Sequence, residues 1–152
     1  MKIFLDTEYT DFGVNRQLIS IGMVADSDEE FYMEFPFDYK LCNEFVIDNV
    51  LPLLNKEQLT EPYKEGNARS SILNWFSIVR RKEETIEVCS DSQSDWDLLI
   101  KALEYNVPQY IVHTNIEENL VYNRMFEFWE ETKLPEHHAL YDAKANRAGF
   151  RK

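Results

Sequence analysis

The chain has 152 residues, of which 44% are hydrophobic and 14% aromatic, so its length and composition predict a single domain, residues 1–152, with a substantial core. Its formal net charge of −12 argues against a protein that coats nucleic acid through clustered basic side chains. An enzyme that holds divalent cations in a carboxylate cluster is not excluded, because the ions themselves supply positive charge.

The first third of the chain is typical of an antiparallel sheet. Three strands are predicted, over residues 2–10, 17–25 and 29–35, with residues 26–28 as a tight hairpin turn between the last two. The second of these runs is apolar almost throughout, which indicates a central strand covered on both faces. We therefore expect a three-stranded antiparallel meander.

Helices and two more strands follow. A helix is predicted in residues 42–54, ending at Pro52, and a second over residues 67–81. Strands over 85–91 and 109–114 then alternate with helices over 94–105 and 117–133. The helical spacing predicts buried apolar stripes made of Ile72, Leu73, Trp75, Phe76 and Val79, of Trp96, Leu99, Ile100 and Leu103, and of Val121, Met125, Phe128 and Trp129.

This order of elements predicts an α/β fold with a mixed sheet of five to six strands and flanking helices. Sites in such sheets gather at the ends of strands and in the loops that follow. No run approaches the roughly 20 apolar residues of a membrane span, so we expect a soluble, cytoplasmic protein with no membrane partner. Cys42 and Cys89 lack CxxC spacing and are expected to be reduced core thiols.

The first predicted strand carries Asp6 and Glu8, which lie two positions apart and therefore leave the same face. Two carboxylates on one face of a buried strand repel each other unless a cation or a proton lies between them. Oxygen ligands of this kind suit Mg²⁺ or Mn²⁺. Because the chain has 28 acidic residues, this spacing also arises by chance, and the pair alone is weak evidence of a site.

A third acid, Asp95, lies near the start of the helix predicted over residues 94–105. Its alternative interpretation is an N-terminal acid that complements the helix dipole. Asp91, just before it, is interpreted as a helix cap.

Two of the three histidines, His137 and His138, are adjacent and precede a helix that we expect to begin near His138. On that helix His138 and Asp142 share one face, which suggests a surface pair. His137 and Asp142 converge only if His137 stays in the loop after Pro135. A loop histidine beside a metal-binding acid is suited to accept a proton from water, because its pKa lies near neutrality.

The segments "FLDTEYTDF", "SDSQSDWDLL" and "HHALYDA" resemble the three motifs of the DEDDh 3′–5′ exonucleases, a branch of the ribonuclease H-like superfamily. Asp6 and Glu8 match the D-x-E of the first motif, Asp95 matches the acid of the second, and His137 and Asp142 match the H-x4-D of the third. The segments "LISIGMVA" and "DNVLPLL" resemble the small RNase AS-like exoribonucleases. The sequence departs from the family at three positions, with Asp11 for a glycine, Asp91 for an asparagine and Ser94 for an aromatic residue.

The resemblance implies a ribonuclease H-like fold and hydrolysis of the 3′ end of single-stranded RNA or DNA, with RNA favoured, to nucleoside 5′-monophosphates. Four acids would hold two Mg²⁺ or Mn²⁺ ions (Asp6, Glu8, Asp95 and Asp142), and His137 would be the general base. Three residues would contact substrate: Thr7, Tyr9 and Phe12. Phe12 would stack on the terminal base, with a core phenylalanine as the equal alternative.

Two more possibilities concern the oligomeric state and a different class of function. Several of them are homodimers, so a homodimer is expected by analogy alone. The other function to be tested is a ribonuclease H-like module that binds nucleic acid or a protein without cleaving it. The complete set of motif residues disfavours this second function.

Overall fold

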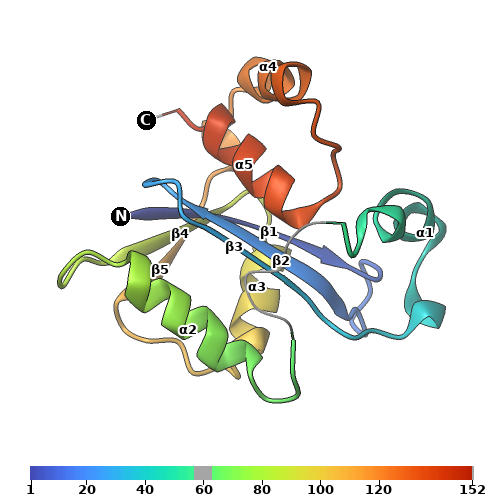
Figure 1. Ribbon diagram of the computed structural model, residues 1–152, viewed down its shortest axis with the longest axis horizontal. Coiled ribbons are helices and arrows are strands. Elements are labelled where there is room, and N and C mark those ends of the chain that lie inside the picture. The colour runs from blue at the N-terminus through green and yellow to red at the C-terminus, as the bar shows by residue number, and fades with distance from the viewer. Residues whose placement is uncertain (57–62, 152) are drawn as a thin grey trace.

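A five-stranded mixed sheet forms the middle of the molecule (Figure 1). The computed structural model describes residues 1–56 and 63–151. The order across the sheet is β3-β2-β1-β4-β5, in which β1, β2 and β3 pair antiparallel whereas β4 and β5 run parallel to β1. The predicted meander and mixed sheet are therefore confirmed. The strands are β1 (Lys2–Tyr9), β2 (Leu18–Ala25), β3 (Glu30–Glu34), β4 (Ile86–Ser90) and β5 (Ile111–Asn115).

Helices cover both faces of this sheet (Figure 1). One face packs on α2 and α3, and the other packs on α5, which in turn packs on α4. The short helix α1 packs through Val46 on Ile19 at the start of β2. The helices are α1 (Glu44–Asn49), α2 (Ala68–Val79), α3 (Gln93–Ala102), α4 (Tyr122–Thr132) and α5 (Ala139–Gly149).

The central strand β1 sends alternate side chains into the two layers. Ile3 and Leu5 are fully buried in the core that the sheet forms with α2 and α3. Phe4 faces the other way and packs with Ala143 of α5. Asp6 and Glu8 continue the Phe4 row toward the carboxyl end of the strand. The alternation that places apolar side chains in the two cores therefore also places the carboxylates of Asp6 and Glu8 on the side of the sheet that faces α5.

Two predicted helices are divided in the structure. In residues 42–54, α1 is followed by a 3₁₀ turn over Leu51–Leu53 that contains Pro52. At its other end, Asn43 caps α1 by accepting a hydrogen bond from the Val46 N–H at 2.9 Å. In residues 117–133, a 3₁₀ turn over Glu117–Asn119 precedes α4.

The prediction that the last of these helices buries its apolar stripe is wrong. None of the residues of α4 is buried, because the helix lies on the outside of the molecule against α5 (Figure 1). The four residues of the stripe are only half-buried: Val121, Met125, Phe128 and Trp129.

Two smaller expectations concern membrane-spanning segments and the cysteines. No helix within residues 1–56 and 63–151 is long and apolar enough to cross a membrane. Cys42 and Cys89 are both free thiols, as predicted, but only Cys89 is buried in the core.

Candidate metal centre and active site

The first turn of α5 lies directly on the sheet at Gly22, the residue of β2 that pairs with Asp6. A Cβ atom at Gly22 would lie 2.1 Å from the backbone nitrogen of Leu140 and 2.2 Å from the carbonyl carbon of Ala139. Only glycine permits this approach of backbone to backbone. Gly22 therefore allows α5, which carries Asp142, to lie beside the carboxylates of β1. The available signal in the sequence was a glycine inside an apolar central strand.

The loop before α5 brings His137 and Asp142 together. His137 has a left-handed backbone with φ of 65°, and its backbone N–H donates a 3.0 Å hydrogen bond to Oδ2 of Asp142. This conformation is uncommon for a residue other than glycine and is found where the surrounding structure requires it. His137 stays in the loop while Asp142 lies in the first turn of α5, which is the arrangement that their convergence requires.

The predicted surface pair of His138 and Asp142 is wrong. His138 is only 2% exposed, and its ring stacks on Tyr32 and Tyr141, with centroid distances of 4.5 and 4.0 Å. It precedes the first residue of α5, so its side chain enters the layer between β3 and the helix. The two adjacent histidines thus differ: His138 packs between aromatic rings, whereas His137 is bonded through its backbone to Asp142.

Asp95 is held by the strand that carries the first two acids. Its Oδ1 accepts hydrogen bonds from the Thr7 backbone N–H at 3.1 Å and from the Thr7 hydroxyl at 2.7 Å. Asp95 is only 2% exposed, and its second oxygen, Oδ2, is buried without a hydrogen-bond partner in the described residues. The Thr7 hydroxyl therefore positions Asp95, which leaves Oδ2 for another ligand.

Asp91 does not have the role that the sequence suggested for it. The cap of α3 is Ser92, whose hydroxyl accepts from the Ser94 N–H at 3.1 Å, so the interpretation of Asp91 as the cap is wrong. Asp91 instead accepts a 3.3 Å hydrogen bond at Oδ1 from the side-chain amide of Asn146 on α5. The carboxyl end of β4 is thereby tied to the helix that carries Asp142.

The acids form two groups that share one member. In each group, one carboxylate oxygen per residue lies within 4.8 Å of the others. One group contains Asp6, Glu8 and Asp142, and the other contains Asp6, Asp91 and Asp95. The four acids predicted to converge, which come from β1, α3 and α5, therefore lie together, and Asp91 joins them.

Burial and mutual repulsion make Asp6, Glu8, Asp95 and Asp142 hard to ionise. Burial is the main cause in each case: it raises the pKa of Glu8 to about 8 and the pKa values of Asp95 and Asp142 to about 7, with neighbouring acids adding to the shifts. The pKa of Asp6 is also raised well above its usual value, by burial and then by repulsion from Asp95. Shifts of this kind are typical of functional sites.

A divalent cation fits this centre. None of the salt bridges among residues 1–56 and 63–151 involves any of the five acids. The donors are carboxylate oxygens alone, which suit Mg²⁺ or Mn²⁺ rather than a thiolate- or imidazole-binding metal. The buried, unpartnered Oδ2 of Asp95 points to the same conclusion, because a buried polar atom without a partner is costly.

We expect the metal-free protein to lose stability as the pH rises. The folded state holds these protons more tightly than the unfolded chain, whose carboxyl pKa values are about 4, so the free energy of unfolding falls between about pH 4 and pH 8. The loss should be at least several kcal/mol, since the pKa of Glu8 alone rises from 4.5 to about 8 and one pKa unit corresponds to about 1.4 kcal/mol. Urea unfolding in EDTA at about pH 5.5 and pH 8 measures it.

The matched control for this pH dependence is Glu8→Gln, which removes the group whose pKa reaches about 8. The variant should lose less stability than the unmodified protein over the same interval. Equal slopes for the two proteins would contradict the assignment of the pH dependence to this cluster.

A hollow of about 180 Å³ opens beside the first group of acids. Asp6, Glu8, His137 and Asp142 line it together with Thr7, Tyr9, Phe12 and Phe45. Phe12 is 78% exposed, so the alternative of a core phenylalanine is wrong. Its ring meets Tyr9 edge to face at a centroid distance of 5.8 Å. The three predicted substrate contacts therefore lie on the hollow's wall.

Phe45 is the aromatic residue of this hollow that the sequence did not single out. It is 50% exposed on α1, and its ring meets that of His137 edge to face with centroids 4.9 Å apart. Asn43, which caps α1, donates from its side chain to Asp11 and from its backbone to the carbonyl of Thr10. These bonds join α1 to the loop after β1, which places Phe45 and Phe12 at one hollow.

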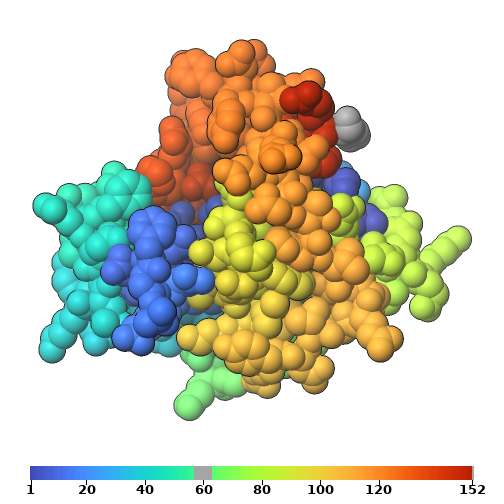
Figure 2. Space-filling view, turned by 180° about the vertical axis from the view of Figure 1, so that it is seen from behind, coloured from blue at the N-terminus to red at the C-terminus, as the bar shows by residue number. Residues whose placement is uncertain are grey.

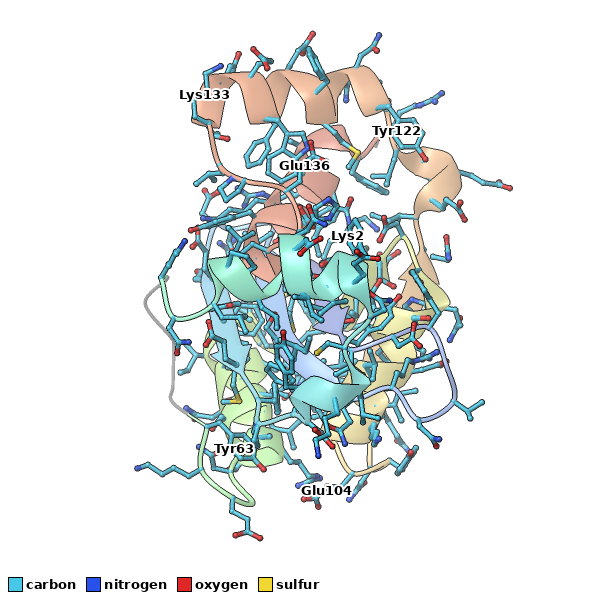
Figure 3. The ribbon with its side chains drawn as sticks, turned by 90° about the vertical axis from the view of Figure 1, so that its right-hand side faces the viewer. Lys2, Tyr63, Glu104, Tyr122, Lys133 and Glu136 are labelled. Atoms are coloured by element: carbon cyan, nitrogen blue, oxygen red, sulfur yellow. The ribbon has the colours of Figure 1, made fainter. Side chains whose placement is uncertain are left out.

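A second hollow of about 170 Å³ lies on the α4 side of the acids. Its lining includes Asp6, Asp91 and Asp142 together with Met125 and Trp129 of α4. Glu136, also in the lining, is seen beneath α4 in Figure 3, where Tyr122 and Lys133 mark the two ends of that helix. The acids are therefore open on two sides, with aromatic side chains near both openings.

The space-filling view shows the segments that meet around this region (Figure 2). The blue residues of the N-terminal segment lie between the cyan segment of α1 and the yellow segment of α3, below the orange and red residues of α4 and α5. Segments from both ends of the chain thus come together on one side of the molecule.

Comparison of the chain with models of known protein families and with curated proteins finds no match.

Proposed function

We propose that this protein is a metal-dependent 3′–5′ exonuclease that hydrolyses single-stranded nucleic acid, RNA in preference to DNA, to nucleoside 5′-monophosphates. One observation carries the proposal: two groups of carboxylates share Asp6, and His137 lines the same hollow as the first group. The mixed sheet is compatible with a ribonuclease H-like fold. The 3′–5′ polarity and the preference for RNA rest on the resemblance to the DEDDh exonucleases.

Two Mg²⁺ or Mn²⁺ ions, when bound, would supply an attacking water of lowered pKa and stabilise charge on the leaving 3′ oxygen. Asp6 would contact both ions, with Glu8 and Asp142 at one position and Asp95 at the other. His137 would accept a proton from the water as the water oxygen bonds to phosphorus and the bond between phosphorus and the leaving 3′ oxygen breaks. The hydrogen bond from its backbone N–H to Asp142 holds the His137 backbone beside this acid, and His137 lines the same hollow as Asp6 and Glu8.

The aromatic residues support a single-stranded substrate. Phe12 and Phe45 are exposed at the hollow beside the catalytic acids, and Tyr9 lines it as well. Bases that are free of a duplex stack on aromatic rings, with little dependence on sequence. The terminal nucleotide would occupy this hollow, with its base against these rings and its phosphate at the acids.

Replacement of Phe45 by alanine is expected to weaken substrate binding more than it slows turnover. Loss of one base stack costs about 1–3 kcal/mol, so the KM for a short RNA should rise about tenfold or more. A smaller fall in kcat is expected, because the Phe45 ring also contacts His137. Steady-state kinetics on a defined single-stranded RNA separate the two effects.

Phe126→Ala is the matched control, since Phe126 is 65% exposed on α4 and lines neither hollow. An unchanged KM for Phe45→Ala, or an equal rise in both variants, would remove Phe45 from the substrate site.

One assay distinguishes the exonuclease from the second candidate function, a module that binds nucleic acid without cleaving it. Purified protein is incubated with 5′-labelled single-stranded RNA and DNA in Mg²⁺, Mn²⁺ or EDTA. Metal-dependent ladders that shorten from the 3′ end, with nucleoside 5′-monophosphate as product, support the exonuclease. Intact substrate in every lane, together with a shift of the labelled strand on a native gel, would support the binding module.

A further inference from the structure

We propose that Asp91 is a metal ligand, so that the second cation position is held by three carboxylates and fills before any nucleic acid binds. This inference rests on the proposed function for the role of the ion, but its geometry is independent of the reaction. Asp91 has a carboxylate oxygen within 4.8 Å of oxygens of Asp6 and Asp95.

The arrangement of Asp91 leaves one oxygen for a cation. Its Oδ1 accepts from the amide of Asn146, which is itself only 2% exposed. Asn146 lies one turn after Asp142 on α5, so the helix that supplies a ligand to the first position also orients Asp91. A hydrogen bond to a coordinating carboxylate is the usual way in which its orientation is fixed.

A second, independent observation points to a ligand at the same place. Asp95 is 2% exposed, its Oδ1 is bonded twice to Thr7, and its Oδ2 has no hydrogen-bond partner in the described residues. No basic side chain pairs with Asp6, Asp91 or Asp95 in the described residues. A cation among these three carboxylates would satisfy Oδ2 and remove their repulsion.

The number of carboxylates at the second position determines whether a cation binds there before the nucleic acid does. Mg²⁺ and Mn²⁺ sites in phosphate-transfer enzymes commonly have one or two carboxylates and depend on substrate phosphate for further ligands. Three carboxylates at the second position provide the negative charge without the phosphate. The protein should therefore bind two ions in the absence of nucleic acid.

Titration of the metal-free protein with Mn²⁺ by isothermal calorimetry tests this directly. The unmodified protein should bind two Mn²⁺ per chain without nucleic acid. Asp91→Asn keeps the acceptor for Asn146 but loses the charge, so one of the two binding steps should weaken about tenfold or more. Asp142→Asn should weaken the other step instead.

The control is Asp97→Asn, which removes an exposed acid of α3 that belongs to neither group. It should bind two Mn²⁺ with unchanged affinities. One Mn²⁺ per chain for the unmodified protein, or two unchanged steps for Asp91→Asn, would overturn the assignment of Asp91 and leave the nuclease proposal standing. Two Mn²⁺ bound without cleavage of any strand would support the assignment of Asp91 and contradict the nuclease proposal.

Discussion

Asp6→Asn is expected to lower nuclease activity by about three orders of magnitude or more, because Asp6 is the one acid common to both carboxylate groups. Both Mn²⁺ binding steps should weaken in this variant. The other acids belong to one group each, so their removal leaves the second group complete. Turnover of single-stranded RNA and calorimetric Mn²⁺ titration of the same preparation measure the two effects.

The same substitution should stabilise the metal-free fold. Burial raises the pKa of Asp6, and repulsion from Asp95, Asp142 and Glu8 raises it further. At about pH 8 the neutral amide removes this repulsion, so the free energy of unfolding in EDTA should rise by about 1 kcal/mol or more. A loss of activity caused by misfolding would instead lower it.

Asp48→Asn, which removes an exposed acid of α1, serves as the control. It should change neither activity nor stability. Full activity in Asp6→Asn would contradict the proposed function. A fall in stability equal to that of a core substitution would show that the lost activity reports on folding alone.

The site residues that could be located from the sequence are those whose relative positions depend only on their spacing within one element or one loop–helix segment. Alternation along a strand places Asp6 and Glu8 on one face whatever surrounds them. Because His137 and Asp142 lie five residues apart, they can converge only if one lies in the loop and the other in the helix, as they do. The mixed sheet also follows from patterning, because a tight turn joins the second and third strands whereas a helix separates the last two.

The residues that the sequence did not locate owe their place to partners far along the chain. Asp91 and Ser92 are both suitable helix caps, and Ser92 takes that place while Asp91 is bound by Asn146, 55 residues later. Phe45 reaches the hollow because α1 is tied to the loop after β1. His138 was assigned to the surface because local spacing gives no sign of the two tyrosine rings that enclose it.

Gly22→Ala is expected to have the largest effect on the fold and to disrupt the site with it. The added Cβ would lie within 2.4 Å of three backbone atoms of Ala139 and Leu140, which cannot move as the end of a side chain does. The first turn of α5 would have to shift away from β2. Overpacking of this kind costs about 3 kcal/mol or more against backbone, which urea unfolding would measure.

The shift of α5 should also separate Asp142 from Asp6, because Gly22 is the residue that pairs with Asp6 across the sheet. Where the variant remains folded, Mn²⁺ binding at the group with Asp142 should weaken more than binding at the group with Asp91 and Asp95. Gly13→Ala is the matched control, since its new Cβ would have no heavy atom closer than 4.0 Å, an Asp11 oxygen. An unfolding midpoint for Gly22→Ala equal to that of Gly13→Ala would show that contact between α5 and the sheet does not set the distance between the acids.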